Sequence, residues 1–167
     1  YFVGLPCRCC VGDEKCDLLR QQSEQKDDRL TWANLFVNAN YLIFLRDTIP
    51  IIGFRTINIV CHQKAQVEQL PFETHKVFRI GANAWVDDYE NTLKDMQTYL
   101  EDNQIRNEVF VFCAGVLSNM LIYQLTRMNS NNTYIDLGSV FDVTMSLGEM
   151  RQYLKGKKKR LKKVCIW

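Results

Sequence analysis

The sequence has no long hydrophobic run. The longest candidate, residues 42–54, is interrupted by Arg46, Asp47 and Pro50, so it falls short of the roughly 20 apolar residues that a membrane-spanning helix needs. The N-terminus also lacks the basic region, apolar stretch and cleavage site of a secretory signal. We therefore expect a cytoplasmic protein without a transmembrane segment, whose cysteines lie in a reducing compartment.

Several catalytic motifs are missing as well. The sequence has neither a GxGxxG turn nor a P-loop, which argues against a nucleotide-fold oxidoreductase. Its two histidines, His62 and His75, lack a recognisable Ser, Asp or Cys partner pattern, so triad-type nucleophilic catalysis has little support.

An initiator Met is also absent, and residues 1–4 have the pattern of a strand end. We therefore expect the chain to be incomplete at its N-terminus.

The composition is that of an ordinary globular protein. Hydrophobic residues make up 47% of the chain and charged residues 24%, which argues against disordered and fibrous classes. A chain of 167 residues fits one domain, which buries roughly two thirds of the surface that the unfolded chain exposes. Since no repeat, linker or change of composition marks a boundary, we predict a single domain over residues 1–167.

Strand-like and helix-like patterns alternate along the chain. After a strand end at residues 1–4, apolar and β-branched runs predict strands at residues 55–61, 76–80, 109–114 and 133–137. Helical spacing of apolar residues predicts helices at residues 13–23, 32–47, 85–102 and 117–128. Thr31 is the expected N-cap of the helix at 32–47, and Pro50 is expected to stop it. The alternation predicts an α/β fold with an open, mostly parallel, Rossmann-like sheet flanked by helices.

The turn after the predicted strand at residues 109–114 is a candidate anion site. Ligands of open parallel sheets bind beyond the C-terminal ends of the strands, where helices begin. Gly115 follows this strand and permits close approach, while Ser118 and Asn119 lie at the start of the next helix. Backbone N–H groups and the positive end of the helix dipole favour a phosphate there. A tight connection without a ligand is the alternative.

A second candidate follows the predicted strand at residues 133–137. Asp136 lies near the strand end, Gly138 and Ser139 form the turn, and Asp142 comes three residues later. Two carboxylates placed in this way suit a divalent cation or a ribose hydroxyl. They suit equally well the capping of the segment that follows.

Three asparagines extend the candidate set. Asn38 and Asn40 lie inside a predicted helix, where Asn is a poor helix former, so their amides need compensating hydrogen bonds. Asn83 lies in another strand-to-helix turn and is the expected N-cap of the helix after it. Three roles remain open for these residues: hydrogen bonds to a ligand at the sheet edge, hydrogen bonds between structural elements, and helix capping.

Three segments carry a resemblance to a known family. They are residues 80–89 (IGANAWVDDY), 111–125 (VFCAGVLSNMLIYQL) and 134–139 (YIDLGS). In order and spacing they resemble the C-terminal half of the catalytic domain of GT-D-type glycosyltransferases. The resemblance covers about residues 55–142, with a weaker likeness at residues 1–6. The family's metal-associated Asp-x-Glu motif lies upstream of these segments, and Ser139 stands where the family has His.

The resemblance implies transfer of a sugar from a nucleotide-sugar donor to a glycan or other acceptor, assisted by Mn²⁺ or Mg²⁺. A cation and a helix N-terminus would stabilise the charge on the departing diphosphate. The resemblance places Asp136 and Asp142 as catalytic candidates. It also implies that seven residues surround the donor: Gly115, Ser118, Asn119, Ser139, Asn38, Asn40 and Asn83. The alternative is an inactive structural or protein-interaction subunit that keeps the fold.

The seven cysteines fall into two groups. Three lie in apolar, strand-like runs where thiols act as small core residues: Cys61, Cys113 and Cys165. Four lie close together near the N-terminus: Cys7, Cys9, Cys10 and Cys16. Their spacing partly resembles that of zinc ligands, and a zinc site, thiols and disulfides all remain open for this group.

Basic residues are concentrated near the C-terminus. The segment 155–163 contains no acid and seven basic residues: Lys155, Lys157, Lys158, Lys159, Arg160, Lys162 and Lys163. Such a segment can contact a polyanion such as nucleic acid or an acidic membrane. The alternative is a solvated turn before a last strand at residues 164–167.

Overall fold

The structure is a computed structural model that describes residues 1–155. The chain divides into two compact units. The first unit consists of residues 1–46 with the described residues from Met150 onward, and the second unit consists of residues 47–149. Among the described residues, no helix is both long enough and apolar enough to cross a membrane.

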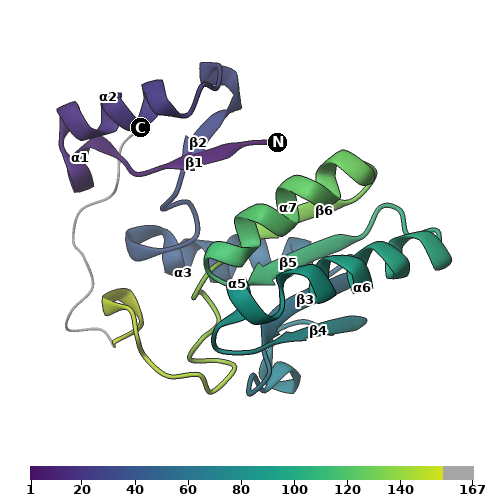
Figure 1. The fold of residues 1–167 in the computed structure, drawn as a ribbon. Helices are drawn as coiled ribbons and strands as arrows, with labels where there is room; N and C mark the ends of the chain where they lie inside the picture. Colours follow the sequence, from purple (N-terminus) through teal and green to yellow (C-terminus); the bar gives the residue numbers. More distant parts are fainter. Residues whose placement is uncertain (156–167) are drawn as a thin grey trace. The chain divides into compact units, whose positions relative to one another are not determined.

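The second unit is built on a sheet of four parallel strands in the order β4-β3-β5-β6 (Figure 1). The strands are β3 (Ile57–His62), β4 (Lys76–Ile80), β5 (Val109–Cys113) and β6 (Thr133–Asp136). β3 and β5 are buried along nearly their whole length, as expected for apolar strands covered on both faces. The predicted α/β class and the open parallel sheet are confirmed.

Helices connect these strands and cover one face of the sheet (Figure 1). They are α5 (Ala84–Asp87), α6 (Tyr89–Asp102) and α7 (Val116–Met128). Met96 of α6 and Leu121 of α7 are fully buried in one cluster with Phe110 and Phe112 of β5. The alternate residue Val111 points to the opposite face and is buried as well. Both faces of the sheet are therefore covered.

The remaining elements of the second unit are short. α4 (Ile49–Ile52) precedes the sheet, and the 3₁₀ helix η4 (Val67–Gln69) lies between β3 and β4. Beyond β6 the chain makes a series of turns whose residues Val140, Phe141 and Met145 are fully buried. The Phe141 ring lies 5.5 Å from that of Phe72, so this segment packs against the β3–β4 connection.

The strand order creates a point where successive connections diverge. The chain leaves β3 for β4 on one side, and after β4 it crosses back to β5 on the other side of β3. In parallel sheets a crevice opens at such a point, beyond the C-terminal ends of the two strands. The turn after β5 borders this crevice between β3 and β5, and the turn after β6 lies at the same C-terminal edge of the sheet, one strand farther away.

The first unit pairs β1 (Val3–Leu5) with β2 (Leu30–Trp32) in parallel. Between them lie α1 (Arg8–Val11), α2 (Asp13–Gln22) and the 3₁₀ helix η1 (Asp27–Arg29). The unit continues through the 3₁₀ helix η2 (Asn38–Asn40), α3 (Tyr41–Ile43) and the described 3₁₀ turn η5 (Gln152–Leu154). The rings of Tyr41 and Tyr153 lie 5.2 Å apart and join η5 to the rest of this unit.

Most predicted elements are confirmed within one or two residues, but the helix predicted at residues 32–47 is wrong. Leu30–Trp32 is a strand, so Thr31 is not an N-cap, and residues 33–37 form turns. Helical structure begins at η2 and runs through the π-helical η3 (Phe44–Thr48) into α4. Pro50 lies inside this continuous helical run, shortly after the π-helical η3, instead of ending it. The last predicted strand, residues 164–167, lies outside the described residues.

A buried polar contact in the second unit gives a test of this fold. Asn58 of β3 is fully buried; its amide donates to Glu108 at 2.7 Å and accepts from the Tyr99 hydroxyl at 3.2 Å. We expect Asn58→Ala to lower the free energy of unfolding by about 1–3 kcal/mol, because both partners lose a buried hydrogen bond. Urea unfolding measures this. The control is Asn131→Ala in the exposed turn before β6, expected to change stability by less than about 0.5 kcal/mol; equal losses would contradict the assignment.

Candidate functional site

The turn from β5 into α7 is held open by the backbone of Gly115. This residue has φ 57° and ψ −132°, a conformation that side-chain-bearing residues rarely adopt. A Cβ atom at Gly115 would meet nothing within 4 Å, so the glycine is needed for its backbone shape and not for packing. Val116, the first residue of α7, is 73% exposed. The start of α7 is therefore accessible from solvent.

Ser118 ties this turn to the neighbouring strand. It is fully buried in the first turn of α7, and its Oγ accepts a hydrogen bond from the Ala114 N–H at 3.3 Å. The same hydroxyl hydrogen-bonds to the carboxylate of Asp136 at the end of β6. Ser118 thus acts inside the turn as a positioning residue. Asn119, the next residue, is exposed.

Asp136 has a carboxylate held partly away from water. Its Oδ1 accepts a hydrogen bond from the Gly138 N–H at 2.9 Å, which fixes the turn after β6. Burial raises the pKa of Asp136 above its ordinary value, and this effect outweighs the opposing hydrogen bonds from Gly138 and Ser118. Gly138 has φ 51°, and a Cβ atom there would also meet nothing within 4 Å. The second turn is therefore as open as the first.

Asp142 and Ser139 continue the turn after β6. The Asp142 N–H donates to the Ser139 carbonyl at 3.2 Å, and both residues are half-buried. Asp142 and Asp136 both act on the Cys113 thiol, whose pKa is raised well above its usual range first by burial, then by Cys61 and by these two carboxylates. The structure therefore gathers the predicted residues after β5 and β6 in one place. We call residues 114–119 and 136–142 the β5–β6 edge.

Asn83 lies in a different turn. It has the predicted N-cap position of α5, but its side chain makes no capping hydrogen bond and is exposed. The turn is held instead by Asp88, whose carboxylate accepts from the Gly81 N–H at 2.7 Å. Asn83 follows β4, and β3 separates β4 from β5 in the sheet. It is therefore not part of the β5–β6 edge.

Asn38 and Asn40 lie in the first unit, and their amides are used there. Asn38 donates to the Asn34 side-chain oxygen at 3.1 Å, and Asn40 donates to the Asn34 carbonyl at 3.2 Å. These contacts display one of the roles left open for the two residues, which is hydrogen bonding between structural elements. The expectation that they lie inside a regular helix is wrong, since both belong to the 3₁₀ helix η2.

The sequence predicts that Cys61 and Cys113 are small core residues, but it does not predict that they lie beneath the edge, nor the role of Arg79. Cys61 and Cys113 are register partners on β3 and β5, at the ends of the two central strands. Burial raises the pKa of Cys61, an effect that Arg79 on β4 partly offsets. Arg79 donates to the Ala65 carbonyl at 2.6 Å and so fixes the loop after β3. With raised pKa values both thiols stay protonated near neutral pH, which disfavours a nucleophilic role. The alternation of side chains along each strand places both thiols on one face of the sheet. That Cys61 lies opposite Cys113, however, depends on how β3 pairs with β5.

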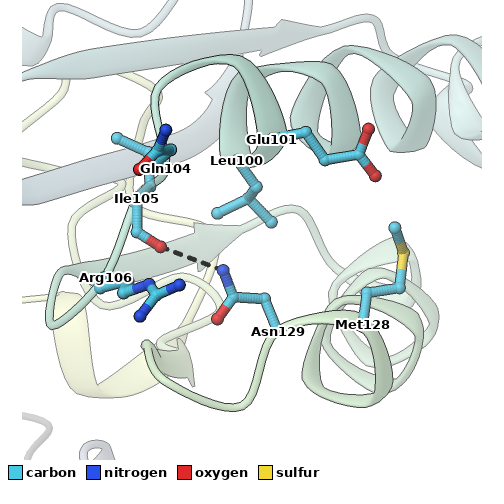
Figure 2. Close-up of a pocket in the computed structure, with 7 residues that line it drawn as sticks. All are labelled: Leu100, Glu101, Gln104, Ile105, Arg106, Met128 and Asn129. Carbon is cyan, nitrogen blue, oxygen red and sulfur yellow. Dashed lines mark hydrogen bonds between the residues drawn. The ribbon is translucent and has the colours of Figure 1, made fainter.

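A cavity of about 230 Å³ lies elsewhere in the second unit (Figure 2). It is formed by the C-terminal ends of α6 and α7 and the turn before β5, and its lining residues are Leu100, Glu101, Gln104, Ile105, Arg106, Met128 and Asn129. The Asn129 amide donates to the Ile105 carbonyl at 3.0 Å across it. These turns precede β5 and β6, so the cavity lies at the N-terminal edge of the sheet, opposite the β5–β6 edge.

Within the described part of the chain, Asp136 and Asp142 of the β5–β6 edge do not belong to a group of three or more ligand atoms that could hold a cation without a substrate. Among the described residues, the one group of three or more His, Cys, Asp or Glu ligand atoms close enough to share a metal is Cys7, Cys9 and Cys10, in the first unit. Asp136 already accepts hydrogen bonds from Gly138 and Ser118. Of the basic segment, Lys155 is exposed, and its other six basic residues lie outside the described part.

Comparisons of this chain with family models, with curated proteins and with solved structures found no match.

The raised pKa of Asp136 predicts a pH-dependent stability. The folded chain keeps this proton at a pH where the unfolded chain has lost it. The contribution of Asp136 to the free energy of unfolding therefore falls as pH rises from its ordinary pKa of 3.8 through the raised one. Asp136→Asn cannot titrate, so we expect the stability of the wild type relative to this variant to decrease across that window and then level off. Urea unfolding at a series of pH values measures it, and a relative stability that rises with pH would contradict the raised pKa.

Proposed function

We propose that the second unit is a glycosyltransferase-like domain that binds the diphosphate of a nucleotide-sugar donor at the β5–β6 edge. One observation carries the proposal. The turns that follow two neighbouring parallel strands each contain a glycine with positive φ, and the space beside both glycines is open. Open backbone at the C-terminal ends of parallel strands is where nucleotides bind in folds of this class.

The start of α7 supplies the chemistry for a diphosphate. A helix of 13 residues begins at Val116, and the first N–H groups of a helix have no carbonyl partner within it. These groups and the helix dipole attract negative charge. No acidic residue lies in the first turn of α7 to compete for them. Gly115 has no side chain that would keep a phosphate away from this backbone.

The turn after β6 supplies polar groups beside the proposed diphosphate position. Asp136 is hydrogen-bonded on one oxygen by Gly138, and Ser139 and Asp142 follow it in the same turn. A half-buried carboxylate next to an anion site can accept a hydrogen bond from a ribose or sugar hydroxyl. We assign Asp136 and Asp142 to the donor sugar or ribose and leave the diphosphate to the backbone of α7.

The reaction proposed for this donor is sugar transfer to an acceptor, with release of the nucleoside diphosphate. This proposal rests on the resemblance of residues 80–89, 111–125 and 134–139 to GT-D-type glycosyltransferases. Amide groups that hold the departing diphosphate would stabilise the charge that develops on it. A second candidate is a domain that binds the donor without transferring the sugar. The lack of a group of three or more His, Cys, Asp or Glu ligand atoms among the described residues of the β5–β6 edge favours this alternative.

The proposal is tested by adding a negative charge at the start of α7. Asn119→Asp places a carboxylate in an exposed position near the helix N-terminus, where it favours the helix but repels a diphosphate. We expect calorimetry with uridine and guanosine diphosphates and their sugar derivatives to show binding by the wild type. We expect the variant to bind about 5- to 30-fold more weakly, as a repulsion of roughly 1–2 kcal/mol predicts.

The matched control is Asn131→Asp. It makes the same change of charge at an exposed residue in the turn before β6, at the opposite edge of the sheet. We expect its affinity to equal that of the wild type. Equal weakening by both variants would show a long-range charge effect, and no binding by the wild type would overturn the donor site. Release of nucleoside diphosphate in the presence of acceptors separates transfer from binding alone.

A further inference from the structure

Three cysteine thiols of the first unit lie together. The Sγ atoms of Cys7, Cys9 and Cys10 are all within 4.8 Å of one another, and those of Cys7 and Cys9 are 3.1 Å apart. Cys7 is 2% exposed, whereas Cys9 and Cys10 are exposed. The cluster therefore has one buried member and an open side through which a small ion can enter.

Local structure holds the cluster in place. Cys7 precedes α1, and its carbonyl accepts a hydrogen bond from the Cys10 N–H at 3.0 Å, so the two side chains three residues apart share one side of the turn. Arg8 forms ion pairs with Asp13 at 3.1 Å and Asp17 at 2.6 Å, which join α1 to α2. The thiols thus lie on a backbone that is fixed by contacts other than their own.

An asparagine side chain is directed at the sulfur atoms. The Asn34 amide nitrogen lies 3.7 Å from the Sγ of Cys7 and 3.7 Å from the Sγ of Cys10, at hydrogen-bonding distance for sulfur. The orientation of the Asn34 side chain is set by Asn38, whose amide donates to the Asn34 side-chain oxygen at 3.1 Å. N–H groups that point at sulfur stabilise the thiolate form, and outer hydrogen bonds of this kind orient metal ligands.

We propose that Cys7, Cys9 and Cys10 form a three-thiolate site for a thiophilic metal cation of the Zn²⁺ class. Thiolates select soft and borderline cations over Mg²⁺, Ca²⁺ or Mn²⁺. On binding, each of the three thiols releases its proton to solvent and forms a sulfur–metal bond, so no oxidant or reductant is needed. Water can complete the fourth position that Zn²⁺ requires. Asn34 is the positioning residue, and Asn38 orients it.

Cys16 lies outside this set although it is close in sequence. Its Sγ donates to the Pro6 carbonyl at 3.6 Å, and the side chain is buried in α2. This gives a matched control, because Ser at position 16 keeps a donor for the same carbonyl. The proposed site uses residues of the first unit alone, so it does not rest on the donor site proposed for the second unit.

The test is metal titration of the reduced full chain. Cd²⁺ is the probe, since thiolate-to-cadmium charge transfer absorbs in the ultraviolet, and Zn²⁺ is measured by competition. We expect one equivalent to bind. Cys9→Ser and Cys10→Ser change exposed side chains and should weaken binding by more than about 100-fold, whereas Asn34→Ala, an outer-shell change, should weaken it by about 10- to 100-fold. Cys16→Ser should bind like the wild type.

Other outcomes would overturn the proposal. The first is a wild type that takes up no stoichiometric Cd²⁺ or Zn²⁺. The second is uptake that survives both Cys9→Ser and Cys10→Ser. The third is a loss of uptake in Cys16→Ser as large as that in these two variants. Quantitative conversion of the cluster to a disulfide in the presence of Zn²⁺, seen by mass spectrometry, would also overturn it. Circular dichroism of each variant establishes that the fold is retained, and the Asn34→Ala result tests the site with all three ligands intact.

Discussion

The parallel pairing of β3 with β5 is the constraint on which the second unit depends. It runs from Ile57 opposite Val109 to Cys61 opposite Cys113, and both strands are buried on both faces. Because β4 occupies the other side of β3, the chain must cross back to reach β5. This crossing makes the connections diverge beyond the C-terminal ends of the strands. The open turn after β5 borders that divergence, and the turn after β6 lies beside it at the same edge of the sheet.

The residues at the β5–β6 edge divide into those that shape the turns and those that face open space. Ser118 is fully buried between the Ala114 N–H and the Asp136 carboxylate, so it connects two turns and does not contact solvent. The backbones of Gly115 and Gly138, by contrast, border open space. The edge therefore offers the N–H groups at the start of α7 more than reactive side chains; the Gly138 N–H is already bonded to Asp136. Binding of an anion suits this arrangement better than covalent catalysis does.

The first unit contains chemistry of a different kind. Its thiols are brought together by a short turn, and the asparagines that follow β2 form a hydrogen-bonded chain from Asn38 through Asn34 to the sulfur atoms. Asn38 and Asn40 were expected inside a helix with compensating hydrogen bonds; they lie instead in the 3₁₀ helix η2, where both bond to Asn34. Asparagines that lie close together in a sequence can thus hydrogen-bond to a neighbouring thiol cluster instead of to a ligand at a sheet edge.

The sequence by itself determined the strands of the second unit, the helices between them and the two glycine turns, because strong apolar periodicity and glycine act locally. It did not predict β2, since the spacing of Trp32, Leu35 and Phe36 suits a helix while pairing with Val3–Leu5 makes Leu30–Trp32 a strand. The register of Cys61 with Cys113, the burial of Asp136 and the approach of Asn34 to Cys7 were decided only by tertiary structure. Each depends on residues far apart in sequence, whose contacts form only when strands pair and helices pack.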